Sequence, residues 1–189
     1  MTDRQHSGSP REEAIRLLEE ELVRHEGDLG PDHPETLRRR RELARLCRAA
    51  GRYPQAIRLY QEALETLERL LGLGHPDTLR IRSSLANVYY AAGCYHQALQ
   101  LFQEILVSRQ QVLGPDHPDT LRSRGSLANS YRAAGRYEEA IGLYREVLAA
   151  RERVLGHHHP STRASRKNLE AAYQAAGRAQ AARETTEKV

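Results

Sequence analysis

One sequence unit recurs four times along the chain at a constant step of 42 residues. It is carried by the strings LGPDHPETL, LGLGHPDTL, LGPDHPDTL and LGHHHPSTR, which place His-Pro at 33/34, 75/76, 117/118 and 159/160. A glycine keeps the same step, at Gly51, Gly93, Gly135 and Gly177. A unit of this length is one supersecondary block that cannot bury its apolar face alone, so successive blocks stack. The sequence therefore predicts a solenoid.

The third copy shows how one unit is expected to fold. Pro118 suits the first turn of a helix, because its fixed φ is helical and its missing N–H has no partner there. Gly135 supplies a left-handed residue that ends this helix, which we call helix A. Helix B is expected from about Tyr137 to about Val154, and the short Gly-Arg connection makes the two helices antiparallel. Apolar residues recur at steps of three and four, at Leu121, Leu127, Ala128, Tyr131 and Ala134 in helix A and at Ala140, Ile141, Tyr144, Val147 and Leu148 in helix B.

The same step divides the chain into segments. Residues 1–10 are expected to form a disordered tail, and residues 11–28 align with a helix B, so they form a half repeat. Three full repeats follow, at 29–70, 71–112 and 113–154. The fourth, at 155–189, is expected to end in a capping helix, because its apolar face becomes small or polar as a terminal cap requires. The residues that change it are Ala179, Arg183, Thr185 and Thr186.

The sequence contains no sign of a membrane span, a cofactor or an active site. No run approaches the roughly 18 apolar residues of a membrane span, and the opening MTDRQHSGSP lacks the pattern of a signal peptide, so we expect a cytoplasmic protein without membrane contact. There is no Gly-rich phosphate loop, no GxSxG and no HExxH, so we expect no enzyme. Cys47 and Cys94 lie in different repeats and are interpreted as structural thiols.

The histidines are not expected to bind metal. The recurring His of each unit lies on a different rung of the solenoid, too far from the next to share an ion. Only His157, His158 and His159 form a local cluster, and zinc sites use spaced ligands with supporting contacts. We interpret this cluster as a solvated turn.

Small residues recur on both helices, where they would let the helices approach closely, at Ala44, Ala86 and Ala128 and at Ala56, Ala98 and Ala140. With the recurring tyrosines and the LGxxHP connector, this pattern resembles the tetratricopeptide repeat. The long unit is similar to the repeats of kinesin light chains and of arrays found beside signalling ATPases in bacteria. The resemblance implies a right-handed α-solenoid of antiparallel helix pairs, in which each helix A lines a concave groove. It also implies a scaffold that binds a protein partner.

Helix A residues that point away from the apolar face form a stripe of mostly basic or amide side chains. The predicted peptide-binding residues are Arg38, Arg41, Arg45, Arg80, Asn87, Tyr90, Arg122, Asn129, Arg132 and Lys167. The arginines would pair with carboxylates, and Tyr90 would pack against a ligand side chain. Asn87 and Asn129 resemble the groove asparagines by which tetratricopeptide arrays hold a peptide backbone. Arg151, on helix B, is expected to lie on the outer surface.

Positive charge is concentrated in the helix A segments. Residues 34–51, 76–93, 118–135 and 160–177 together carry a formal charge of +9, against +4 for the whole chain, so the remainder carries −5. A concave surface of one sign steers an oppositely charged partner. The sequence therefore predicts an adaptor that binds an extended, acidic peptide segment in a basic groove. The alternative is that these arginines are solvated and pair with glutamates of neighbouring helices.

Two other functions stay open. A pI of about 9.3 would suit nucleic acid, although a net charge of only +4 and a single exposed aromatic residue in the groove argue against it. The chain could also be an assembly module of a larger signalling protein. In that case the half repeat at 11–28 would stack on another chain, giving self-association through the ends of the array.

Overall fold

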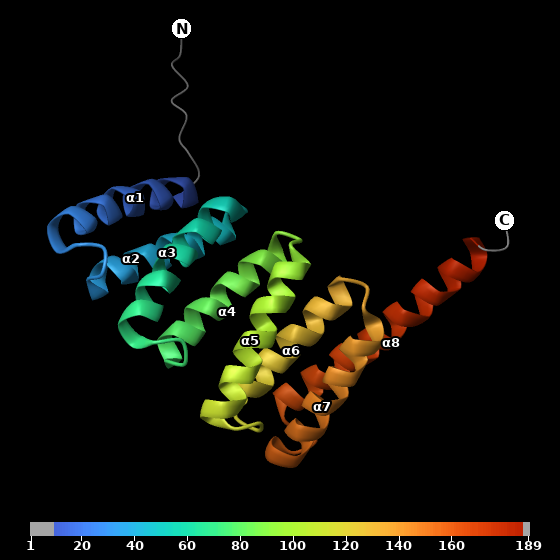
Figure 1. Ribbon diagram of the computed structural model, residues 1–189. Coiled ribbons are helices and arrows are strands. Elements are labelled where there is room, and N and C mark those ends of the chain that lie inside the picture. Colours follow the sequence, from blue (N-terminus) through green and yellow to red (C-terminus); the bar gives the residue numbers. More distant parts are fainter. Residues whose placement is uncertain (1–9, 187–189) are drawn as a thin grey trace, which may run out of the picture. The chain divides into compact units, whose positions relative to one another are not determined.

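The structure, a computed structural model, describes residues 10–186, with side chains described up to residue 180. All regular structure in this range is helical, which confirms the predicted all-α class. The chain divides into two compact units, one up to Ala92 and one from Gly93 onward. Figure 1 labels the helices of both units.

The first unit holds α1 (Pro10–Leu29), α2 (Pro34–Ala49), α3 (Tyr53–Leu71) and α4 (Pro76–Ala91). α2 packs against α1 and α3, and α3 also packs against α4. α1 and α3 are helices of type B, and α2 and α4 are helices of type A. The tail expected at residues 1–10 lies outside the described residues, apart from Pro10, which begins α1.

The second unit holds α5 (Tyr95–Leu113), α6 (Pro118–Ala133), α7 (Tyr137–Leu155) and α8 (Pro160–Thr186). α6 packs against α5 and α7, and α7 also packs against α8. Type B and type A helices therefore alternate here as in the first unit, with α5 and α7 of type B.

Every helix of type A begins with the same side-chain cap. The ring nitrogen Nδ1 of the recurring histidine accepts a hydrogen bond from the backbone N–H two residues further on, at 3.1–3.2 Å. The four capping residues are His33, His75, His117 and His159. A proline follows each cap, where a missing N–H costs nothing. The His-Pro pair is thus a helix start signal, and for His159 the expected solvated turn has a definite structural role.

Glycine ends the type A helices in three repeats but not in the last. Gly135, after α6, has φ +76°, in the left-handed region that glycine adopts without steric cost. Gly177 occupies the equivalent position, yet its φ is not positive and α8 continues through it. The expected break between helix A and a capping helix is therefore absent. The alanine-rich sequence around Gly177 favours a continuous helix, and the side chains of Arg183, Thr185 and Thr186 lie outside the described part.

Small side chains make the close contacts between helices, as predicted. Ala44, Ala86 and Ala128 are fully buried, and so are their helix B counterparts Ala56 and Ala98. A larger side chain at such a position would force the helices apart, at a cost of about 1–3 kcal/mol. Close packing therefore depends on these alanines.

A buried threonine ties each type A helix to the helix before it. Its hydroxyl group donates to the backbone carbonyl eleven residues earlier, at 3.3–3.4 Å. The four threonines are Thr36, Thr78, Thr120 and Thr162, and all are fully buried. These carbonyl groups lie near the ends of the type B helices, and a carbonyl oxygen has two lone pairs, so it can accept a second hydrogen bond.

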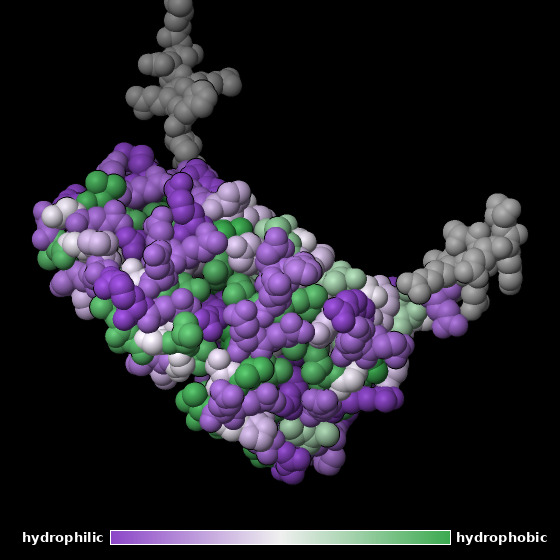
Figure 2. Space-filling view, viewed as in Figure 1, coloured by the Kyte–Doolittle hydropathy of each residue, from purple (hydrophilic) through white to green (hydrophobic). Residues whose placement is uncertain are grey.

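Hydrophilic residues cover most of the face seen in Figure 2, and hydrophobic residues appear between them in small groups. No helix in the described part of the chain is long and apolar enough to cross a membrane. Cys47 is buried and Cys94 partly buried, and both are free thiols. Burial raises the pKa of Cys47.

Candidate peptide-binding surface

In the first unit, four predicted site residues border one hollow of about 410 Å³ between α2 and α4. Its lining consists of Arg38, Arg41, Glu42 and Arg45 from α2, Tyr60 from α3, and Arg80, Ile81 and Ser84 from α4. We call it the cationic hollow. The stripe predicted from helix angles thus comes together across two successive type A helices.

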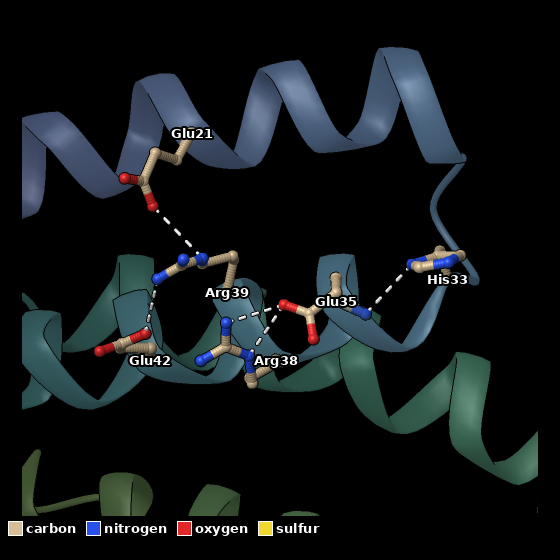
Figure 3. Close-up of polar contacts among 6 residues, drawn as sticks. All are labelled: Glu21, His33, Glu35, Arg38, Arg39 and Glu42. Carbon is tan, nitrogen blue, oxygen red and sulfur yellow. Dashed lines mark hydrogen bonds and ion pairs between the residues drawn. The ribbon is translucent and has the colours of Figure 1, made fainter.

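Two of these arginines pair with an acid in the first turn of their own helix. Arg38 pairs with Glu35 (Figure 3), and Arg80 pairs with Asp77. The distances between the paired atoms are 2.8 Å and 2.6 Å. Side chains in both pairs are about half exposed, and an exposed pair of this kind contributes about 0.2–1 kcal/mol. A ligand carboxylate can therefore compete for these guanidinium groups at small cost.

Arg41 and Arg45 differ from this pattern. Neither has a carboxylate oxygen within 4.0 Å among the described residues. Burial lowers the pKa of Arg41, the positive charge of Arg80 lowers it further, and Asp77 partly offsets both effects. Because arginine keeps its proton in proteins, the hollow holds positive charge that an anion would stabilise.

The floor of the hollow carries two hydroxyl groups. The Ser84 hydroxyl donates to the backbone carbonyl of Arg80 at 3.1 Å, and the buried Tyr60 lies near it. Burial raises the pKa of Tyr60, while the Ser84 hydroxyl and the nearby arginines act in the opposite direction. Sequence reasoning missed both residues, because Tyr60 has the period of a core residue and Ser84 lies beside the stripe. Only the packing of α3 beneath α2 and α4 reveals them.

The remaining stripe residues of the first unit lie outside the hollow. Asn87 is exposed on α4, and its amide nitrogen donates to the backbone carbonyl of Ser83 at 2.8 Å. Tyr90, near the end of the same helix, is partly exposed. The structure therefore brings together the predicted arginines of this unit, without Asn87 and Tyr90.

In the second unit the stripe is less concentrated. Arg122 repeats the first-turn pattern, with Asp119 at 2.5 Å. Asn129 is partly buried, and its Oδ1 accepts a hydrogen bond from the hydroxyl of Tyr144 on α7. Arg132 on α6 is partly exposed and Lys167 on α8 is exposed.

Some of the positive charge on the type A helices is paired with acidic residues of neighbouring helices. The residues concerned are Arg40, Arg82, Arg124 and Arg166, which pair with Glu26, Glu68, Glu146 and Glu152 on type B helices. Arg40 and Arg82 are buried. The alternative considered for the stripe was that its arginines pair with glutamates of neighbouring helices. Such pairs are made by this separate set of arginines.

The expectation that Arg151 lies on the outer surface is wrong. It is partly buried, and its Nη1 donates to the Ser161 carbonyl at 3.1 Å and to Ser165 Oγ at 2.7 Å. Burial lowers the pKa of Arg151, and the charge of Arg122 lowers it further. This residue joins α7 to α8.

A comparison with known protein families agrees with the repeated helix pairs. The sequence model of the tetratricopeptide repeat matches residues 10–69, 41–106, 77–153 and 124–189. The chain belongs to the tetratricopeptide repeat family. Such repeats generally mediate protein–protein interactions as scaffolds, and they are typically non-catalytic. Comparison with curated protein sequences finds no match.

Solved structures with tetratricopeptide-like repeats match nearly the whole chain. Two structures of a putative kinesin light chain with nearly identical repeats from Podosopora anserina, one of them a variant, are 33% identical, with TM-scores of 0.80 and 0.79. Each match covers 94% of this chain and 84% of the other. BtubC (BKLC) from P. vanneervenii is 22% identical with a TM-score of 0.74, over 95% of this chain and 72% of that one, and shows a likeness of fold. The predicted α-solenoid is thereby confirmed.

No group of three or more histidine, cysteine or acidic side chains in the described part of this tetratricopeptide protein could hold a metal ion. His157 contacts Glu152 at 3.3 Å, and His159 caps α8. The contacts of these two histidines are thus structural.

Proposed function

We propose that this tetratricopeptide protein is a non-catalytic adaptor that binds an extended, acidic segment of another protein, anchored in the cationic hollow. One observation carries the proposal. Arg41 and Arg45 face a hollow shared with Arg38 and Arg80, and no carboxylate in the described chain lies within 4.0 Å of either. Arg41 is also partly buried, and a partly desolvated cation without a carboxylate partner favours an anionic ligand, because charge-assisted hydrogen bonds are strongest where water is displaced.

The other stripe residues of the first unit would contact the rest of the segment. Asn87 is exposed on the same helix as Arg80, and its amide can offer an oxygen to a backbone N–H of the ligand. Tyr90 would pack against a ligand side chain. Within the second unit, Arg122, Arg132 and Lys167 would bind carboxylates, and Asn129 would contact a peptide backbone.

Titration calorimetry with short peptides tests this proposal. A glutamate-rich peptide should bind more tightly than its glutamine counterpart, and Arg80→Ala should weaken acidic binding by about 1.5–3 kcal/mol, the range for hydrogen bonds to charged groups. Arg58→Ala is the matched control, because Arg58 is exposed on α3 and its one ion pair within the described residues is with Glu62, at 4.0 Å. Equal losses from the two variants would place the binding surface elsewhere. Tighter binding of single-stranded nucleic acid, with a steep salt dependence, would favour the nucleic-acid alternative.

We also propose self-association as a second function, from a comparison of equivalent residues. Leu17 on α1 is 47% exposed, whereas Leu59, its counterpart on α3, is 5% exposed. Tyr173 on α8 is 43% exposed, whereas Tyr131 on α6 is 8% exposed. Light scattering should show a concentration-dependent mass that Leu17→Glu abolishes. A constant monomer mass would rule this function out.

A further inference from the structure

The cationic hollow is larger and more positive than one carboxylate requires. It measures about 410 Å³ and is lined by four arginines and one acid, Glu42. That acid already contacts Arg39 at 3.3 Å (Figure 3). Arg41 and Arg45 alone would leave one positive charge over after binding a single carboxylate.

The floor of the hollow adds a neutral hydrogen-bond donor. The Ser84 hydroxyl already donates its proton to the backbone carbonyl of Arg80, at 3.1 Å. The Tyr60 hydroxyl borders the hollow and can donate its proton into it. A ligand that matches both features has a charge near −2 and several acceptor oxygens on one atom.

We propose that the cationic hollow binds a phosphate monoester, carried by a phosphorylated side chain of the acidic partner segment. A phosphorylated residue brings a charge of about −1.5 to −2 at neutral pH and three acceptor oxygens. Arg41 and Arg45 match its charge, and the Tyr60 hydroxyl can donate to it from the floor. Arg38 and Arg80 can release their exposed acids and bind its oxygens instead. This inference rests on the proposed function and specifies the group that is bound.

The site belongs to the first unit. The equivalents of Arg41 in later repeats are Ser83, Gly125 and Lys167, and those of Arg45 are Asn87, Asn129 and Ala171. Two basic residues coincide only at Arg41 and Arg45. One phosphorylated residue would therefore bind in the first unit and set the register of the segment there.

Three peptides test the proposal, identical except for phosphoserine, glutamate or serine at the centre of an acidic sequence. Calorimetry on the full chain should show the phosphoserine peptide binding about tenfold more tightly than the glutamate peptide, which is one added charge-assisted bond. Arg41→Gln and Arg45→Gln should each remove this preference, while Arg58→Gln should keep it. Arg45 is exposed, so its variant tests the site even if the partly buried Arg41 is needed for folding.

The pH dependence separates phosphate from carboxylate. If only the dianion binds, affinity for the phosphoserine peptide should fall about fourfold between about pH 7.5 and about pH 5.5, because the second pKa of the phosphate is about 6. The lining residues from α2, α3 and α4 include no histidine, the side chain that ordinarily titrates in this range. The glutamate peptide, measured at the same pH values, reports any titration of the protein.

Each outcome separates this inference from the proposed function. Equal affinity of the phosphoserine and glutamate peptides, both above serine, would overturn the phosphate site and leave the acidic-segment proposal standing. Equal affinity of all three peptides, unchanged by Arg45→Gln, would overturn both. If free O-phosphoserine competes as tightly as the phosphoserine peptide, the site takes a small phosphate monoester and its assignment to a partner segment is overturned.

Discussion

The hydroxyl group of Tyr144 on α7 donates a hydrogen bond to Oδ1 of Asn129 on α6. Tyr144 is almost fully buried, so this asparagine supports the core of the second unit as well as lying in the predicted stripe. Its carbonyl oxygen is therefore already engaged when a ligand arrives.

Replacing Asn129 should change stability before it changes binding. Asn129→Ala removes one hydrogen bond of a buried hydroxyl, and we expect a loss of about 1 kcal/mol in the free energy of unfolding. Urea denaturation measures it. Tyr144→Phe should give a similar loss, and the double variant should lose less than the sum of the two. Strictly additive losses would mean that the two side chains do not interact.

The histidine caps can be tested at one helix. His117→Ala removes the acceptor for the Asp119 backbone N–H at the start of α6, and we expect destabilisation by about 0.5–2 kcal/mol. His117→Asn should restore most of this, because asparagine is a favourable N-cap residue. Thermal melting compares the two variants with His158→Ala, which alters an exposed residue that caps no helix. Equal melting temperatures for all three would show that the cap contributes nothing.

The two equivalent glycines should respond in opposite directions to alanine. Gly177→Ala should stabilise α8 by about 0.5–1 kcal/mol, since its backbone is helical and nothing lies within 4 Å of an added Cβ. Gly135→Ala should destabilise the protein by about 1 kcal/mol, because φ at this position is +76°. Chemical denaturation of the two variants distinguishes them. Destabilisation by Gly177→Ala would mean that the chain turns there as in the other repeats.

A buried polar pair in the second unit replaces an apolar pair of the first. Arg109 donates to Ser123 Oγ at 2.5 Å, while Leu67 and Ile81 hold the equivalent positions. Ser123→Ile alone should cost about 1–3 kcal/mol, because the guanidinium loses a buried acceptor.

Adding Arg109→Leu should recover this loss, since replacing a whole buried polar pair with apolar residues is often neutral or stabilising. A double-mutant cycle in urea gives the coupling energy. A double variant that is less stable than Ser123→Ile would show that the apolar pair cannot replace the polar pair.

Local features of the fold could be predicted from sequence because they depend on neighbouring residues. The His-Pro pair, such as His117 and Pro118, starts a helix in every repeat. The 42-residue step shows which helices are equivalent. The turn predicted at Gly177 is wrong, because glycine is compatible with both a turn and a helix. The conformation of this glycine depends on the structure that packs against the following residues, and the local sequence does not determine that packing.

The candidate site could be predicted only as a direction on a helix. Helix angles correctly brought Arg41 and Arg80 to one surface, since that position depends on α2 and α4 alone. They could not show that Tyr60 reaches the hollow from α3, or that Arg151 turns toward α8, because both depend on packing between helices. Helix angles therefore predicted the stripe from the sequence, and the packing of the helices showed which part of the stripe borders a hollow.

A charge-swap titration tests the central claim most directly. The Arg41→Glu/Arg45→Glu variant and the unaltered protein are titrated by calorimetry with a glutamate-rich peptide and with its lysine counterpart, after circular dichroism has shown equal helix content. We predict that the variant loses affinity for the acidic peptide and gains affinity for the basic one, because like charges repel and opposite charges attract in the same hollow. Unchanged binding of the acidic peptide by the folded variant would contradict the account.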